Sequence, residues 1–125
     1  MNTYYHNPKC SKSREGLEIL KQMGVKFQIK EYLKEGFDKE ELRNIFKLLQ
    51  KSPEQVVRSK EKVFEELNLK NKVLSLDEWI ETIIKYPMLM ERPILKSAKS
   101  ALIGRPPEVF KSFNDQKAGS ATVPQ

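Results

Sequence analysis

The sequence predicts an α/β fold in which helices flank a four-stranded mixed sheet. Three observations lead to this prediction. A strand–helix–strand pattern fills residues 1–33, helical patterns occupy the middle of the chain, and two short strand patterns followed by a helix come near its end. The resulting order, β-α-β, helical insertion, β-β-α, allows the strands from both ends of the chain to join one sheet.

The first strand–helix–strand unit begins with the aromatic segment TYYH at residues 3–6. The turn residues NPK end this strand, and a helix begins near Ser11 to Ser13. The helix has an apolar face and ends at a glycine suited to a left-handed C-cap: Leu17, Leu20, Met23 and Gly24. Apolar and polar residues then alternate through VKFQIKEYL, residues 25–33, which predicts a second strand reached by a right-handed crossover.

The middle of the chain is predicted to be a helical insertion over residues 38–86. Two capping pairs mark the starts of its longer helices: Asp38 with Glu41, and Ser75 with Glu78. Apolar residues recur at helical spacing after each pair, and Pro87 ends the second helix. The stretch between them is interpreted as short helices broken near Pro53 and Ser59.

The end of the chain predicts a β-hairpin and a last helix. Short strands are expected at 94–96 and 101–103, joined by the polar turn SAKS. In the segment RPPEVFKSF, Pro106 and Pro107 stop the hairpin and start the helix, because proline suits the first helical turn.

Composition limits the classes of function. At 125 residues the chain has the size of one domain, which we place at 1–113, with a flexible tail at 114–125. Its 23 Lys and Arg against 17 Asp and Glu give a formal charge of +6, which favours anionic ligands. The chain has no apolar stretch long enough to span a bilayer and no pattern of a signal peptide. We therefore expect a cytoplasmic protein with no membrane partner, and we expect a monomer.

The only cysteine, Cys10, lies in the polar and basic segment HNPKCSKSR, where a predicted strand gives way to a predicted helix. The unpaired N–H groups and the dipole at the amino end of a helix favour a thiolate, and also an oxyanion ligand. Lys12 and its basic neighbours add positive charge, and the hydroxyls of Ser11 and Ser13 are candidates to hydrogen-bond the anion. These features predict a lowered pKa for Cys10. The alternative is a small buried apolar residue without chemistry.

Ser13 stands where a C-x-x-C redox motif would have its second cysteine, so an external thiol must complete any redox cycle of Cys10. His6, the only histidine, and Asn7 precede the cysteine. His6 either tunes the Cys10 thiolate or is a hydrogen-bonded structural residue. Because the chain offers no further Cys or His ligands, we expect no metal site.

Four motifs in this order resemble the glutaredoxin-linked arsenate reductases of bacteria, the ArsC family: YHNPKCSKSRE, RSKEKVFEELNL, LMERPI and IGRPPEVF. The resemblance extends to about Phe113. It implies a thioredoxin-like fold and a catalytic cysteine at Cys10. It also implies that Pro93 is the proline that, in this fold, precedes a strand beside the active cysteine in the cis form, which would bring Arg92 next to Cys10.

The resemblance further implies three oxyanion-binding residues, Arg58, Arg92 and Arg105. Arginine suits this role because it stays charged and offers a planar fork of donors to a tetrahedral oxyanion. In so basic a chain, an arbitrary arginine would instead be a solvated surface charge. Only their positions in the motifs distinguish these three.

The reaction implied by the resemblance is reduction of arsenate, or a similar oxyanion, to arsenite. The Cys10 thiolate attacks arsenate, glutathione attacks the adduct, and glutaredoxin resolves the mixed disulfide. Glutathione is then a co-substrate and glutaredoxin a partner, and no bound cofactor is expected. The absence of a second cysteine fits this external resolution.

Two other functions are compatible with the sequence. Spx-type regulators share the fold and bind RNA polymerase, but they typically carry a C-x-x-C switch that Ser13 cannot form. A glutathione-linked thiol oxidoreductase acting on another substrate would use the same Cys10, with a cationic site for glutathione carboxylates. The aromatic residues Tyr4, Tyr5 and Phe27 are assigned to packing around a sheet, so we expect no nucleic-acid partner.

Overall fold

The computed structural model describes residues 1–114, so the predicted tail at 114–125 lies, apart from its first residue, outside the described residues. The chain divides into two compact units. Unit 1 consists of residues 1–32 and those from 92 onward, and unit 2 consists of residues 33–91. The single domain expected over residues 1–113 stays a prediction.

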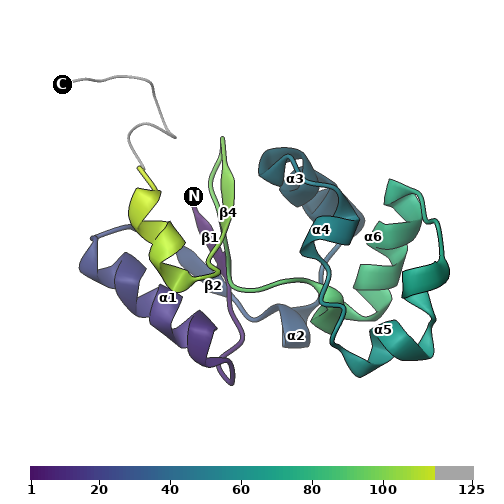
Figure 1. Cartoon of the computed structure of the whole chain (residues 1–125). Helices are drawn as coiled ribbons and strands as arrows, with labels where there is room; N and C mark the ends of the chain where they lie inside the picture. The colour runs from purple at the N-terminus through teal and green to yellow at the C-terminus, as the bar shows by residue number, and fades with distance from the viewer. Residues whose placement is uncertain (115–125) are drawn as a thin grey trace. The chain divides into compact units, whose positions relative to one another are not determined.

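Unit 1 is built on the four-stranded mixed sheet that the sequence predicts (Figure 1). Its elements, in chain order, are β1 (Thr3–Tyr5), α1 (Ser11–Gln22), β2 (Gln28–Lys30), β3 (Ile94–Lys96), β4 (Ala101–Ile103) and the 3₁₀ helix η3 (Pro107–Ser112). The strand order is β2-β1-β3-β4, in which only the β1–β2 pair is parallel. The α/β class is therefore confirmed, and the β3–β4 hairpin has the predicted bounds.

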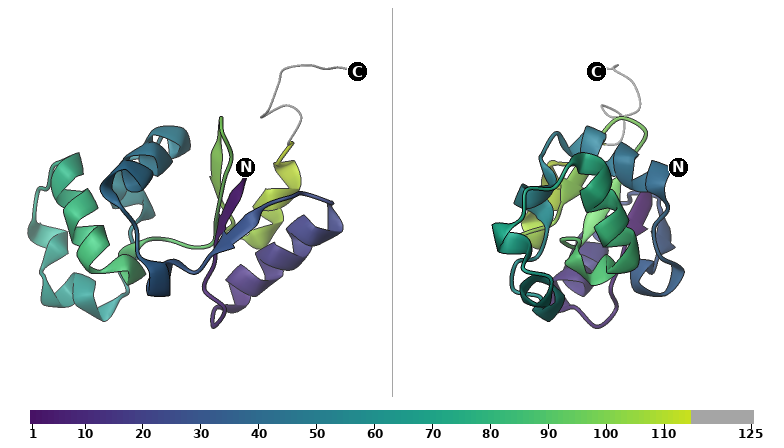
Figure 2. Two further views of the ribbon diagram at one scale, coloured as in Figure 1. Left: turned by 180° about the vertical axis from the view of Figure 1, so that it is seen from behind. Right: turned by 90° about the vertical axis from the view of Figure 1, so that its right-hand side faces the viewer.

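Helix α1 and η3 pack side by side on one face of this sheet, as Figure 1 and Figure 2 show. The buried core between them and the sheet consists of Tyr4, Leu20, Leu95, Phe110 and Phe113. Gly16 of α1 is required here, because a Cβ at this position would lie 2.6 Å from Tyr4 Oη and 2.7 Å from the Phe110 ring. Without that side chain, α1 sits close enough to β1 for Tyr4 Oη to donate a 2.6 Å hydrogen bond to the Ser13 carbonyl.

The second strand is shorter than predicted. The pattern at residues 25–33 predicts one strand, but β2 spans only Gln28–Lys30, and Tyr32 begins the short helix α2 (Tyr32–Glu35). The reason is its partner: β1 offers only Thr3–Tyr5 for parallel pairing. Hydrophobic alternation alone does not give strand length when the neighbouring strand is short.

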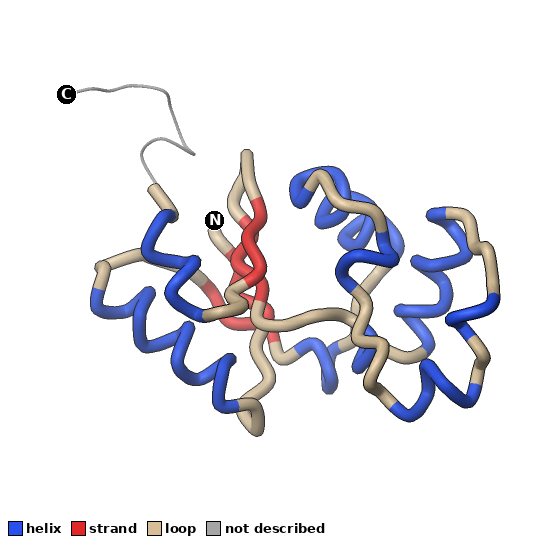
Figure 3. The backbone as a smooth tube through the Cα atoms, in the orientation of Figure 1, coloured by secondary structure: helices blue, strands red, loops and turns tan. Residues whose placement is uncertain are grey.

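The last helix is a 3₁₀ helix, whereas the sequence pattern predicts an ordinary helix over RPPEVFKSF. Its bonds run from residue i+3 to residue i, for example from the Val109 N–H to the Pro106 carbonyl at 3.0 Å. A helix of six residues that starts at Pro107, directly after the N-cap Pro106, lacks early backbone donors and is short enough for this tighter geometry. Figure 3 shows the helices and the short strands along the backbone.

Unit 2 is helical, apart from one isolated β-bridge among its described residues. Its elements are α2, which begins in unit 1, α3 (Lys39–Leu49), α4 (Pro53–Val56), α5 (Lys62–Glu66), η1 (Leu69–Asn71), α6 (Leu76–Lys85) and η2 (Pro87–Leu89). Both predicted capping boxes are present, and α3 packs against α6 through buried apolar faces. Short helices are interrupted near Pro53 and Ser59, as predicted, and Pro53 itself begins α4, which is the usual position of proline in a first turn.

Among the helices of residues 1–114, none combines the length and the apolar character needed to cross a bilayer.

Candidate functional site

The sheet topology of unit 1 brings three loops to one end of the sheet. β1 ends at Tyr5, which lies opposite Ile94, the first residue of β3, and Ile94 lies opposite Ile103, the last residue of β4. The Gly104 N–H then donates a 2.8 Å hydrogen bond to the Pro93 carbonyl. The segments that follow β1, precede β3 and follow β4 therefore meet at this end.

Three residues predicted from the motifs belong to these segments. Cys10 is the N-cap of α1 and is partly exposed, Arg92 lies two residues before β3, and exposed Arg105 lies two residues after β4. The Arg92–Pro93 peptide bond is cis, the isomer that the resemblance implies. The Arg105–Pro106 bond is also cis, a feature that the interpretation of Pro106 as a hairpin stop did not include.

The Cys10 thiol has a lowered pKa. Burial opposes ionisation, but the backbone N–H of Ser13, the charge and a hydrogen bond of Arg92, and the backbone N–H of Lys12 outweigh it. The Cys10 side chain makes no capping hydrogen bond to the first turn of α1. The thiolate is therefore stabilised by several weaker interactions at the amino end of this helix, not by one cap. The side chain of Lys12 is exposed, as is that of Ser11, and neither has a hydrogen bond within residues 1–114.

Ser13 holds the loop in this conformation. It is fully buried, and its hydroxyl receives the Asn7 N–H at 3.0 Å and lies 2.7 Å from Nδ1 of His6. Its carbonyl accepts the hydroxyl of Tyr4. The sequence suggested that the Ser13 hydroxyl could contact the thiolate, but that hydroxyl is occupied by His6 and Asn7, and the backbone N–H of Ser13 interacts with Cys10 instead.

His6 and Asn7 act on the loop and not directly on the sulfur. His6 is buried, and its backbone N–H donates to the Lys30 carbonyl at 2.9 Å, which fixes it to β2. Burial lowers the pKa of His6. The charge of Glu31 acts in the opposite direction, and the charges of Arg14 and Lys21 lower the pKa further. A neutral imidazole can accept the Ser13 hydroxyl proton at Nδ1, and the Asn7 side-chain oxygen accepts the Lys9 N–H at 3.1 Å.

We expect Ser13→Ala to weaken the thiolate site. It removes the partner of a buried imidazole nitrogen and of one backbone N–H, which costs about 1–3 kcal/mol of folding free energy. The loosened loop should also raise the pKa of Cys10, so alkylation by iodoacetamide should need a higher pH. Ser11→Ala, in the same loop but exposed, is the matched control. Identical alkylation profiles for the two variants would show that the Ser13 network does not tune Cys10.

Arg58 belongs to unit 2. Its Nε donates to Glu61 at 3.0 Å and its Nη1 donates to Glu91 at 2.8 Å. Burial opposes its charged form, but these two carboxylates outweigh burial and raise the pKa of Arg58. Nothing in the sequence patterns indicated these two partners, although Glu61 lies three residues after Arg58.

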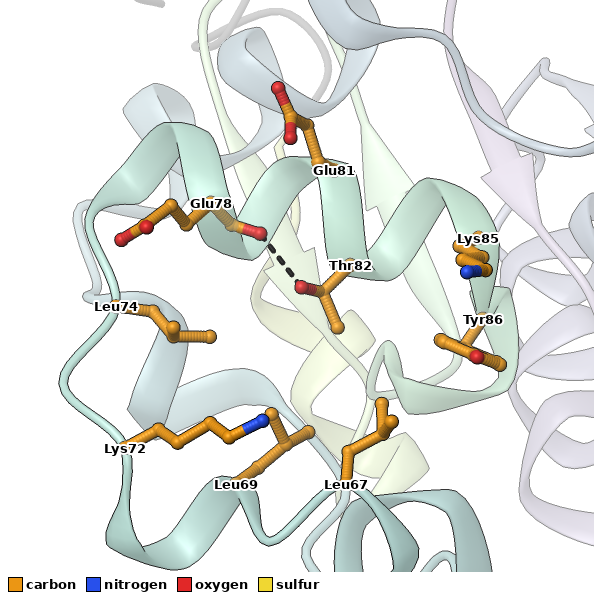
Figure 4. A pocket seen from close by; sticks show the side chains of 9 residues that line it. All are labelled: Leu67, Leu69, Lys72, Leu74, Glu78, Glu81, Thr82, Lys85 and Tyr86. Carbon is orange, nitrogen blue, oxygen red and sulfur yellow. Dashed lines mark hydrogen bonds between the residues drawn. The ribbon is translucent and has the colours of Figure 1, made fainter.

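Unit 2 also contains an open pocket of about 380 Å³ beside α6. Leu67, Leu69 and Leu74 form its apolar part, and Lys72 and Glu78 lie at its border (Figure 4). None of the site residues predicted from the sequence lines it. In residues 1–114, no three His, Cys, Asp or Glu side chains gather in a way that could hold a metal ion.

The family is decided by comparison with known proteins: the model of the ArsC family matches residues 5–113. The chain belongs to the ArsC family. This ArsC protein is 45% identical over 105 residues to an uncharacterized protein, YfgD, of Escherichia coli K12, a match that covers 83% of this chain and 88% of that protein. It is 42% identical over 105 residues to an arsenate reductase of Haemophilus influenzae, covering 83% and 90% of the two chains.

Solved structures agree with this assignment. The structure of an arsenate reductase from Vibrio cholerae matches this ArsC protein with a TM-score of 0.82 and 39% identity, over 86% of this chain and 92% of that one. The ArsC family and the thioredoxin-like fold that the four motifs predicted are thus confirmed.

Proposed function

We propose that this ArsC protein reduces arsenate to arsenite with Cys10 as the nucleophile. The observation that carries the proposal is the pairing of Cys10 with Arg92 at the amino end of α1, which favours both a thiolate and an oxyanion beside it. The similarity to arsenate reductases of Haemophilus influenzae and Vibrio cholerae supports arsenic as the element that is reduced.

In the first proposed step, the Cys10 thiolate attacks the arsenic of arsenate. A sulfur–arsenic bond forms, and one oxygen leaves as hydroxide, which becomes water on protonation. Arg92 stabilises the negative charge on the remaining oxygens, since its charge and a hydrogen bond already act on the Cys10 sulfur. Arg105 and Arg58 are the other two proposed oxyanion ligands.

In the second step, the thiolate of glutathione attacks the Cys10 sulfur. The sulfur–arsenic bond breaks, and its electron pair leaves with arsenic as arsenite, so As(V) becomes As(III). Cys10 and glutathione are oxidised together to a mixed disulfide. A glutaredoxin thiolate then takes the glutathionyl group and returns Cys10 to the thiol. We place this cycle in the cytoplasm, where glutathione keeps thiols reduced, and propose that a monomer is sufficient.

The test is arsenate-dependent oxidation of NADPH, coupled through glutathione reductase, with glutathione and glutaredoxin present. The proposal expects one NADPH per arsenate and a loss of rate when glutaredoxin is omitted. A rate that is independent of glutaredoxin would contradict the role of glutaredoxin in resolving the mixed disulfide, and a rate that is independent of arsenate would contradict arsenate as the substrate.

A second candidate function is exchange of glutathione mixed disulfides at the same Cys10. One observation favours it: the charge of Arg58, one of the three proposed arsenate ligands, is balanced by Glu61 and Glu91, whereas attack of Cys10 on a disulfide does not need Arg58. Here Cys10 would attack the disulfide directly and release the reduced partner thiol. Turnover of a glutathionylated peptide without any turnover of arsenate would favour this function.

A further inference from the structure

Arg58 and Glu91 lie on neighbouring segments of unit 2 that are held by backbone hydrogen bonds. The Arg58 N–H donates to the Leu89 carbonyl at 2.7 Å, and the Glu91 N–H donates to the Val56 carbonyl at 2.9 Å. These bonds flank an antiparallel β-bridge between the two segments. The backbone thus fixes the base of both side chains side by side, although they are 33 residues apart in the chain.

The guanidinium of Arg58 is held from two directions. Glu91 accepts a hydrogen bond from Nη1, and Glu61, the N-cap residue of α5, accepts one from Nε. The exposed fractions of the side chains are 17% for Arg58, 28% for Glu61 and 25% for Glu91, so the cluster is mostly shielded from solvent. Charge-assisted bonds of this length in a shielded place restrict rotation of the guanidinium. Among residues 1–114, Nη2 of Arg58 makes no hydrogen bond, so this nitrogen is available to a ligand.

The two carboxylates also change the charge that a ligand meets. One guanidinium with two carboxylates carries a net charge of about −1 when all three are ionised. An oxyanion approaching Nη2 is therefore attracted by Arg58 and repelled by both glutamates. At separations of a few ångströms and partial burial, each repulsion is large enough to alter the binding constant severalfold.

We propose that Glu61 and Glu91 are positioning residues that orient Arg58 for oxyanion binding through Nη2 and at the same time weaken that binding. The inference rests on the proposed function, because it assumes that Arg58 is an oxyanion ligand. Orientation reduces the ordering that the arginine must undergo when the anion arrives. The two glutamates reduce the net positive charge around Arg58, so the bound oxyanion is released more easily after the reaction. Turnover is then not limited by release of the oxyanion.

The two effects are separated by two variants of Glu91. Glu91→Gln keeps an oxygen acceptor for Nη1 but removes the charge, so KM for arsenate should fall by about threefold or more. Glu91→Ala removes the acceptor as well, so the freed guanidinium should lower kcat by about tenfold. Glu66→Gln is the matched control, because it removes the same charge from an exposed position of unit 2. Glu61→Gln should behave like Glu91→Gln.

A second readout does not need turnover. The Nε–H proton of Arg58 donates to Glu61, so its NMR signal, assigned by its loss in Arg58→Lys, should exchange slowly with water in the wild type. Glu61→Ala should accelerate this exchange, while Glu66→Gln leaves it unchanged. Titration of the same signal with arsenate gives Kd directly, and Kd should be lower in Glu91→Gln than in the wild type.

These results separate failure of the inference from failure of the proposed function. Equal KM and Kd in Glu91→Gln and Glu66→Gln would overturn the charge effect. Wild-type kcat in a folded Glu91→Ala protein, with unchanged exchange in Glu61→Ala, would overturn the positioning effect. If the wild type does not turn over arsenate, the proposed function fails. The NMR titration then decides the inference, which is overturned if arsenate does not move the Arg58 signal.

Discussion

Replacing Cys10 by serine is expected to remove arsenate turnover, with a loss of at least about 10³-fold in kcat. The serine hydroxyl is not ionised at neutral pH, so the donors that favour a thiolate in the wild type cannot make it a comparable nucleophile. The measurement is the coupled NADPH assay on both proteins at equal concentration. Arsenate reduction that persists in the variant would show that another residue carries the chemistry.

The same variant should fold normally. Cys10 is a partly exposed N-cap residue, and serine is a better N-cap than cysteine because its oxygen accepts first-turn N–H groups. We therefore expect a thermal midpoint equal to or above that of the wild type. With such a midpoint, a loss of activity is due to the missing thiolate and not to unfolding. A large fall in the midpoint would mean that the loss of activity could come from unfolding.

The dependence of stability on pH gives a further test of the thiolate. The pKa of Cys10 is lower in the folded protein than its ordinary value, so between the two values the unfolded chain binds more protons. The free energy of unfolding should rise with pH in that window. The stabilisation by the Cys10 thiolate is complete above the pKa of Cys10 in the unfolded chain. It is lost as pH falls through the pKa of Cys10 in the folded protein. Denaturant unfolding at several pH values should show this rise in the wild type and not in Cys10→Ser.

The parts of the fold that were predicted correctly are those determined by local chemistry. The hairpin strands are set by short apolar runs around a polar turn, and both agree with the structure. Asp38 and Ser75 start helices because each side chain accepts a first-turn N–H, a contact that spans only three residues. Such signals are contained in the sequence itself and need no knowledge of the tertiary structure.

The parts that were missed depend on partners elsewhere in the chain. The length of β2 is limited by β1, and Ile29, which the alternation placed in the sheet pattern, is 46% exposed on this edge strand. The contact of His6 with Ser13 requires the loop to turn back on itself over seven residues. The pairing of Arg58 with Glu91 depends on an isolated β-bridge that has no sequence signature.

The candidate site shows the same division. A reactive Cys10 at the start of a helix could be argued from the loop alone, because the backbone N–H groups at the amino end of the helix act locally. The importance of Arg92, 82 positions later, came only from the family motif, since proximity across a sheet is not visible in composition or spacing. The structure adds what neither source contained, namely that Ser13 acts through its backbone N–H.

Replacing Arg92 by alanine is expected to have the second largest effect on activity. Arg92 contributes a charge and a hydrogen bond to the Cys10 thiolate, and in the proposed reaction it also stabilises the arsenate oxygens. Loss of one such donor at a reacting centre costs on the order of 10²–10³-fold in rate. We expect a fall of this size in kcat/KM for arsenate, measured at a pH where Cys10 of the variant is still ionised.

Alkylation of Cys10 at different pH values separates the two roles of Arg92. In Arg92→Ala the midpoint of the alkylation profile should move to higher pH, because a cation that favours the thiolate is gone. Arg92→Lys keeps the charge but not the planar fork, so it should restore much of the alkylation profile and less of kcat/KM. Arg105→Ala, at an exposed position, should leave the alkylation profile nearer to that of the wild type. If Arg92→Ala alkylates like the wild type but loses turnover, Arg92 acts on the oxyanion alone, and the thiolate depends on the amino end of α1.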